Sequence, residues 1–431
     1  MTPVELLRQL IRFDTTNPPG NEAECIAFLR RLLEDAGCEV ELYAKDPARP
    51  NLVARLRGRG DRPPLLLQGH VDVVTTAGQS WSRPPFGGDL VDGWVWGRGA
   101  LDMKGGVAMM VSAFLRAAGD AAQLPGEVVL TVLADEEAGG DHGAKFLVEE
   151  HAHLFDGIEY AIGEFGGFNV EIGGRGMYLV QVAEKQICWL KARVPGRGGH
   201  GAFPQRGGTM ARLARFLADL DRKRLPVHIT PATRAMVEGM AAATRPPYSN
   251  VLRALLRPRL TDRMLPLLRE QARNMEAILR NTVSATIIHA SDQVNVVPGV
   301  VEVELDGRAL PGFGPGDVIA EVHAVVGDDI ELELVRHDAA AVEPRLDRFD
   351  LLAGILQELE PGAVAVPMVQ AGVTDARFFA RLGIQTYGFL PLRLPADFRF
   401  TGLIHAADER VPADAIEFGA EAVFRALQRV G

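Results

Sequence analysis

Several histidines and carboxylates of this chain directly follow apolar segments. His70 and Asp72 lie at the end of residues 65–74, and Glu136 and Glu137 at the end of residues 128–137. Imidazole and carboxylate groups without a thiolate suit one or two divalent ions such as zinc, with cobalt or manganese as substitutes. The pattern therefore indicates a metal hydrolase, with solvated surface carboxylates as the alternative.

Asp102 stands in the segment Gly-Arg-Gly-Ala-Leu-Asp-Met-Lys-Gly-Gly, residues 97–106, and an apolar run over 107–115 follows it. The glycines allow a tight turn and a close approach to a ligand. We expect Asp102 at a junction between a loop and a helix. Glu164, which follows an apolar segment, and the late His405 complete the candidate set.

The segments that precede these residues are short apolar runs, typical of buried strands. Strands 65–68 and 127–133 alternate with helices predicted over 103–118 and 142–150, which is the pattern of an α/β domain. An open α/β sheet places its sites at the carboxyl ends of its strands. His70 and the carboxylates near Glu136 are therefore expected to meet at one edge of a sheet.

The character of the chain changes near residue 178. Strand-like alternation over 179–194 leads into a glycine-rich loop, and the stretch 226–281 has helical spacing with nine arginines against four acidic residues. We predict a catalytic α/β domain, formed by 1–178 and 337–431, with a mixed, largely parallel sheet flanked by helices. Residues 179–336 would form an inserted α+β lid or dimerisation domain with a helical insert around 226–281.

Composition narrows the classes of protein. The 431 residues carry a net charge of -10, which argues against a nucleic-acid partner. The three cysteines (Cys25, Cys38 and Cys188) form no Cys-x-x-Cys pair, and no uncharged apolar run has the length of a membrane span. With no leader-like N-terminus, we expect a soluble, cytoplasmic protein.

Three blocks together resemble the metal-binding segments of the dizinc amidohydrolase family. They are Leu-Gln-Gly-His-Val-Asp-Val-Val (67–74), the segment 97–106 and Ala-Asp-Glu-Glu-Ala-Gly-Gly (134–140). The family includes acetylornithine deacetylase, succinyl-diaminopimelate desuccinylase, the aminoacylases and the glutamate-type carboxypeptidases. The blocks occur in the family's order, and the similarity runs over nearly the whole chain.

The resemblance implies two divalent metal ions, most simply zinc. It assigns His70 and Glu164 to one ion, Glu137 and His405 to the other, and Asp102 as the bridge between them. His70, Asp102 and Glu137 lie in the three blocks, which together are the most specific part of the similarity.

The resemblance also implies catalytic roles. Asp72 would accept a hydrogen bond from the His70 ring and fix its tautomer. Glu136 would be the general base, because water held between two cations loses a proton easily and a neighbouring carboxylate can pass that proton to the leaving nitrogen. We also expect a cis peptide bond at Asp102–Met103.

The predicted lid contributes further residues by the same resemblance. His200, in Gly-Gly-His-Gly-Ala, matches a histidine that stabilises the oxyanion in the other subunit of a dimer. Asn295 and Arg308 match segments that grip the substrate, and a guanidinium suits a planar carboxylate. We therefore expect a homodimer through the lid and a substrate with a free carboxylate beside the scissile amide.

Gly372 and Thr374 match a substrate-binding segment in which many relatives read Gly-Gly-Thr-Asp. This chain reads Ala-Gly-Val-Thr-Asp over 371–375, a bulkier sequence. Glu164 is glutamate where several deacetylase-like members have aspartate, which favours the carboxypeptidase-like and N-acyl amino acid hydrolase branches. The long insert 226–281 resembles the enlarged lid of enzymes that remove long or apolar acyl groups.

The resulting expectation is a hydrolase that cleaves the amide bond of small-molecule N-acyl amino acids. A carboxypeptidase or dipeptidase acting on peptides is the alternative within the class, favoured by an acidic pocket residue for an α-ammonium group. A metal-binding module without hydrolytic activity is the alternative from another class. It would be favoured by loss of the base or of a ligand, and every such position is filled.

Overall fold

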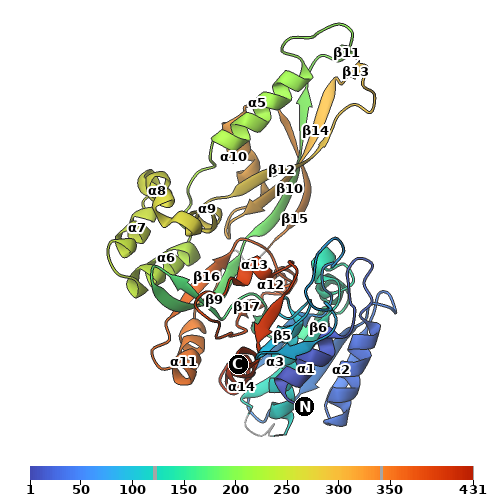
Figure 1. Ribbon diagram of the computed structural model, residues 1–431, viewed down its shortest axis with the longest axis vertical. Coiled ribbons are helices and arrows are strands. Elements are labelled where there is room, and N and C mark those ends of the chain that lie inside the picture. The colour runs from blue at the N-terminus through green and yellow to red at the C-terminus, as the bar shows by residue number, and fades with distance from the viewer. Residues whose placement is uncertain (120–123, 340–342, 431) are drawn as a thin grey trace.

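The computed structural model describes residues 1–119, 124–339 and 343–430. Its largest unit is a mixed sheet of nine strands, in which β6, β3, β7 and β17 are neighbouring parallel strands (Figure 1). In spatial order, with β8 (Phe168–Ile172) paired to β9, the strands are β1 (Glu39–Tyr43), β2 (Asn51–Leu56), β6 (Gly126–Leu133), β3 (Arg62–His70), β7 (Tyr160–Gly163), β17 (Gln385–Gly388), β9 (Arg175–Glu184) and β16 (Ala365–Gln370). The predicted α/β class with a mixed, largely parallel sheet is confirmed.

Helices cover both faces of this sheet, because alternate residues of its strands are apolar on either side. Leu65 and Leu67 of β3 belong to one core, and Leu66 belongs to the other. The first core includes α1 (Pro3–Ile11), α2 (Ala23–Asp35), α3 (Lys104–Ala118), α11 (Phe349–Leu359) and α14 (Ala413–Leu427). The second includes α4 (Ala144–Glu150) and α12 (Ala376–Ala380).

A four-stranded antiparallel sheet projects from the rest of the molecule (Figure 1). Its strands, in order, are β12 (Thr282–His289), β14 (Val300–Ala309), β10 (Gln186–Pro195) and β15 (Glu331–Asp338). Residues of α5 (Thr209–Arg222) and α10 (Pro315–Val326) share a core with this sheet. The short pair β11 (Gly199–His200) and β13 (Val296–Val297) lies at its far end.

The alternation over 179–194 is divided between two sheets. Residues up to Glu184 belong to β9 and those from Gln186 belong to β10, with Lys185 between them. Lys185 is buried, and its Nζ donates to the carbonyls of Ala277 and Arg280 at 3.0 Å each. The chain therefore passes from one sheet to the other at Lys185, whose buried amino group is held by hydrogen bonds to backbone oxygens.

The predicted insert is helical, and it packs against the larger sheet. Its helices are α6 (Pro231–Ala243), α7 (Tyr248–Leu255), α8 (Pro258–Met264) and α9 (Ala272–Leu279). Met236, Val237 and Met240 of α6 share the first core with β16. The division into two domains stays a prediction, and its first boundary, at residue 179, falls inside β9.

The remaining β-strands and α-helix are short. They are the three-stranded sheet of β4 (Asp89–Val91), β5 (Trp94–Trp96) and β18 (Arg410–Pro412), and helix α13 (Phe400–Leu403). Among the helices of the described residues, none combines the length and the apolar character that a membrane crossing requires.

Candidate active site

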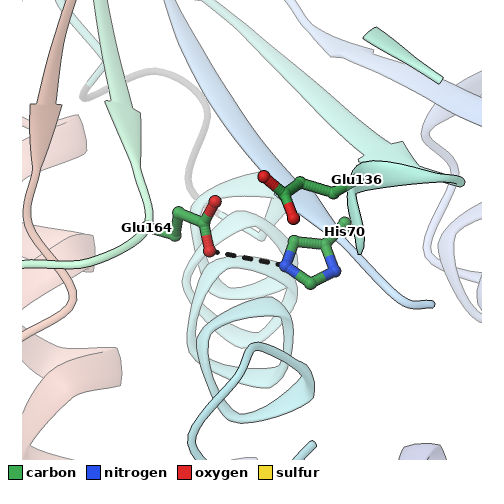
Figure 2. Close-up of side chains that lie close together, drawn as sticks. All are labelled: His70, Glu136 and Glu164. Carbon is green, nitrogen blue, oxygen red and sulfur yellow. Dashed lines mark ion pairs between the residues drawn. The ribbon is translucent and has the colours of Figure 1, made fainter. Parts of the chain in front are cut away.

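Three parallel neighbours of the large sheet deliver the first group of site residues. His70 ends β3, Glu136 begins a single helical turn after β6, and Glu164 follows β7. Figure 2 shows these three side chains converging above the helix that lies behind them. Their ligand atoms lie within 4.8 Å of one another, and the same holds for a second group formed by Asp102, Glu137 and His405.

Asp102 lies between the two histidines. Its Oδ1 is 3.3 Å from Nε2 of His70, and its Oδ2 is 3.3 Å from Nε2 of His405. Glu164 Oε2 lies 3.4 Å from the same atom of His70, and Glu137 Oε1 lies 3.2 Å from the same atom of His405. This is the arrangement of two cation sites that share one carboxylate.

The donor set fits two divalent ions. His70 is 1% exposed, and among the described residues neither its Nε2 nor Oε1 of Glu137 has a hydrogen-bond partner. Buried polar atoms without a partner are costly, so their presence in a cluster points to a ligand. Imidazole and carboxylate groups are ligands that zinc and its substitutes accept.

The cluster is strongly polarised by its own charges. Burial raises the pKa of Glu136 well above its usual range, and the negative charge of Glu164 raises it further. The neighbouring carboxylates of Asp102 and Glu137 raise the pKa of His405 to about 10. The carboxylates gathered around the two imidazoles thus create a site that favours cations.

Asp72 supports both sides of the site. It is fully buried, and its backbone oxygen lies 3.0 Å from Nδ1 of His70, with Oδ1 at 3.4 Å. Its carboxylate also accepts the backbone N–H groups of Glu136 and Glu137, each at 3.1 Å. Asp72 therefore orients the histidine ring and holds the turn that carries the acidic pair.

Glu409 fixes the loop around Asp102. It is fully buried, its Oε1 accepts the N–H groups of Leu101 at 2.7 Å and Asp102 at 3.2 Å, and its Oε2 pairs with Arg98 at 2.7 Å. The expected cis peptide at Asp102–Met103 is confirmed. The sequence analysis missed Glu409, because its contact with the loop of Asp102 joins residues more than 300 positions apart.

Asp135 is a second missed residue, and it directly precedes the acidic pair. It adopts a left-handed conformation, with φ of 69°, and is buried. Its carboxylate accepts from Asn17 Nδ2 at 3.0 Å, Arg49 Nη1 at 2.8 Å and the N–H of His142 at 3.0 Å. These contacts fix the backbone from which Glu136 projects.

His200 and Asn295 are not brought to the cluster within one chain. Both are exposed. His200 lies on β11 and Asn295 directly precedes β13, where Gly201 N–H donates to Asn295 O at 2.8 Å. This pair lies at the far end of the projecting sheet, remote from β6 and α3 (Figure 1). Their predicted roles thus require a second copy of the chain.

Arg308 lies on β14, where Nε and Nη2 bind the two carboxylate oxygens of Asp306 at 2.7 and 3.2 Å. Thr374 is buried, and its N–H and Oγ1 both donate to Glu184 Oε2, at 3.0 and 2.8 Å. Its polar groups are therefore engaged inside the protein, and the structure gives no support to a substrate contact there. Gly372 is half-buried in the same segment.

Comparison with known proteins gives a consistent result. Residues 66–429 match peptidase family M20/M25/M40. Succinyl-diaminopimelate desuccinylase of Paracoccus denitrificans is 28% identical over 99% of this chain and 98% of its own length. The human N-fatty-acyl-amino acid synthase/hydrolase PM20D1 is 27% identical over 85% of this chain and 74% of its own length.

A solved structure shares the fold. The M20 family metallo-carboxypeptidase Sso-CP2 from Sulfolobus solfataricus superposes with a TM-score of 0.69, covering 99% of this chain and 98% of its own. The two sequences are 17% identical, so this likeness establishes the common architecture and leaves substrate choice open.

Proposed function

Because the chain belongs to peptidase family M20/M25/M40, we propose that it cleaves the amide bond of N-acyl amino acids with a free carboxylate. The chain is a metal-dependent amidohydrolase or peptidase, as its family and its hydrolase relatives establish. The observation that carries the proposal is the pair of ligand groups joined by Asp102.

We assign His70 and Glu164 to one ion, Glu137 and His405 to the other, and Asp102 to both. Zinc is the proposed metal, with cobalt or manganese as substitutes. When bound, such ions polarise a carbonyl and lower the pKa of water.

The chain's own residues supply the proton transfer. Glu136 stands beside the ligands, with its backbone held by Asp72, and would take a proton from water and deliver it to the leaving nitrogen. Arg308 would exchange Asp306 for the carboxylate of the substrate. His200 of a second copy would stabilise the oxyanion of the scissile carbonyl.

An apolar acyl group is the proposed specificity. The PM20D1 relative is named for fatty-acyl amino acids. Peptides, which an acidic group for an α-ammonium would favour, are the alternative substrates.

We also propose a homodimer in the cytoplasm. The edge strand β12 exposes Ile287 and Ile288, at 47% and 48%, and within the described part of the chain its outer edge pairs with no other strand of the sheet, so a second copy can pair there. A dimer would also bring His200 to a site that it does not reach in its own chain. All three cysteines are buried and outside any disulfide, as in a reducing compartment.

The direct test compares N-octanoyl-L-leucine with its carboxamide, using zinc-loaded protein and a metal-stripped control. The acid should be cleaved, and the carboxamide should lose about 2 kcal/mol of transition-state stabilisation in kcat/KM, because it offers Arg308 no negative charge in exchange for that of Asp306. Equal cleavage of both compounds would remove the proposed role of Arg308. Cleavage of peptides alone would establish the peptidase alternative.

A further inference from the structure

Arg377 is a buried cation beside the proposed base. It lies on α12 and is 2% exposed. Its Nη1 is 3.7 Å from Oε1 of Glu136 and donates to the carbonyl of Thr374 at 2.8 Å. A guanidinium in such a place does not serve solubility, so its charge acts on the groups around it.

The guanidinium is also held from its other side. Its Nε lies 3.5 Å from Oδ2 of Asp338, and its central carbon lies 4.4 Å from the centre of the Phe378 ring. Contacts with a carbonyl, a carboxylate and a ring restrict a side chain that otherwise has many rotamers. The position of Arg377 is therefore well defined.

Asp338 connects this contact to the four-stranded sheet. It is the last residue of β15, and its Oδ2 accepts from Nε and Nη2 of Arg336 at 3.0 and 2.8 Å. Nη2 of Arg336 also lies 3.4 Å from the carbonyl of Gly139, next to the helical turn that begins with Glu136. The same group of residues thus contacts both the side chain of the base and the backbone of its turn.

Glu136 requires such a partner. Its backbone is fixed by Asp72, but its carboxylate faces the carboxylate of Glu164 in the cluster (Figure 2). When both groups are ionised, their charges repel each other. The guanidinium of Arg377, 3.7 Å from Oε1 of Glu136, attracts the Glu136 carboxylate and offsets that repulsion.

We propose that Arg377 is a positioning residue that holds the Glu136 carboxylate where it can exchange a proton with water and the leaving nitrogen. This inference rests on the proposed function, in which Glu136 is the base. A misplacement of about 1 Å can cost about 100-fold in rate. The role is distinct from ligation of metal and from binding of substrate.

The kinetic test uses zinc-loaded Arg377→Met, Arg377→Lys and Arg381→Met with N-octanoyl-L-leucine. Arg381 is the matched control, because it follows α12, is 41% exposed and pairs with Glu149 at 3.0 Å. Arg377→Met should lower kcat about 100-fold with KM and zinc content nearly unchanged, and Arg377→Lys should recover about tenfold of that loss. Unchanged kcat in Arg377→Met, or a loss confined to KM, would overturn the proposal.

Two further readouts separate positioning from mere structural support. In a Glu136→Gln background, Arg377→Met should cause little additional loss of residual activity, whereas independent effects would multiply. Crystal structures of the same variants show the position of the Glu136 carboxylate and do not depend on any measured activity. It should be displaced in Arg377→Met and remain in place in Arg381→Met, and an undisplaced carboxylate would refute the inference even if the protein cleaved none of the substrates.

Discussion

At the scale of single residues, the proposed mechanism gives two adjacent glutamates different roles. Glu137 lies with Asp102 and His405, whereas Glu136 lies with His70 and Glu164 and next to Arg377. A carboxylate that binds a metal ion cannot also transfer protons freely. The two glutamates of this turn are therefore assigned separately, Glu137 as a ligand and Glu136 as the base.

Replacement of these two glutamates by glutamine tests the assignment. Glu136→Gln should keep its zinc and lose about 10³-fold in kcat, because it retains the shape of the side chain but not its basicity. Glu137→Gln should lose zinc together with activity. Zinc per chain, measured by atomic emission, checks both. Loss of zinc in Glu136→Gln with zinc retained in Glu137→Gln would show that base and ligand are exchanged.

Glu184 gives a prediction about pH. Burial raises its pKa to about 8 from an ordinary value of 4.5, although Thr374 donates to it. Between these values the unfolded chain binds fewer protons than the folded chain, so the stability contributed by this group falls as pH rises.

Glu184→Gln lacks this titration and keeps an oxygen for Thr374. The difference in free energy of unfolding, variant minus wild type, should grow by on the order of a few kcal/mol between about pH 5 and pH 9. Urea unfolding at several pH values measures it. A difference that does not change with pH would show that the pKa of Glu184 is not raised in the folded protein.

The sequence predicted most of the ligand candidates because they follow apolar strands or lie in a glycine-rich loop, and His405 was assigned by the family resemblance. It did not predict the neighbourhood of Arg377. Arg377 and Glu136 are separated by more than half the chain, and their contact depends on how α12 packs beside the turn after β6. Such a contact leaves no local pattern in the residues.

At the scale of elements, the loop that carries Asp102 is fitted closely to α3. A Cβ added at Gly105 would lie 2.2 Å from the carbonyl of Ala100. Since that atom is backbone, a larger residue must move the loop or the start of the helix. Glycine is therefore required at position 105, because the backbone of Ala100 lies too close for a side chain.

Gly105→Ala should lower the free energy of unfolding by about 1–3 kcal/mol and weaken zinc binding, because it displaces Asp102. Gly354→Ala in α11 is the matched control, since nothing lies within 4 Å of its added Cβ. That change should stabilise the protein by about 0.5–1 kcal/mol. Thermal unfolding with and without zinc checks both, and equal effects would mean that the contact at Ala100 is unimportant.

The division of 179–194 into two strands shows a limit of pattern reading at this scale. Alternation continues on both sides of Lys185, so periodicity alone predicts one strand. The change of sheet depends on carbonyls of α9 and the residue after it, which bind the buried ammonium. Those partners are distant in sequence and invisible to a local pattern.

At the scale of the whole molecule, the position of His200 at the tip of the projecting sheet favours a shared active site (Figure 1). In a dimer, a Glu136→Gln subunit could lend its His200 to a His200→Ala subunit. One site of such a mixed dimer would then be complete, and the other would lack both groups.

Mixing equal amounts of the two inactive variants, after subunit exchange, should restore about a quarter of wild-type activity, because half of the dimers are mixed and each has one complete site. The rate of hydrolysis after mixing measures the effect, with each variant alone as the control. Absence of recovery despite confirmed exchange would place His200 outside the site.

Zinc titration of metal-stripped protein, followed by hydrolysis of N-octanoyl-L-leucine, tests the dinuclear centre most directly. The arrangement of two ligand groups around Asp102 predicts that activity rises until two equivalents of zinc per chain are bound and then levels off. Full activity at one equivalent, or activity that survives removal of all metal, would contradict the account.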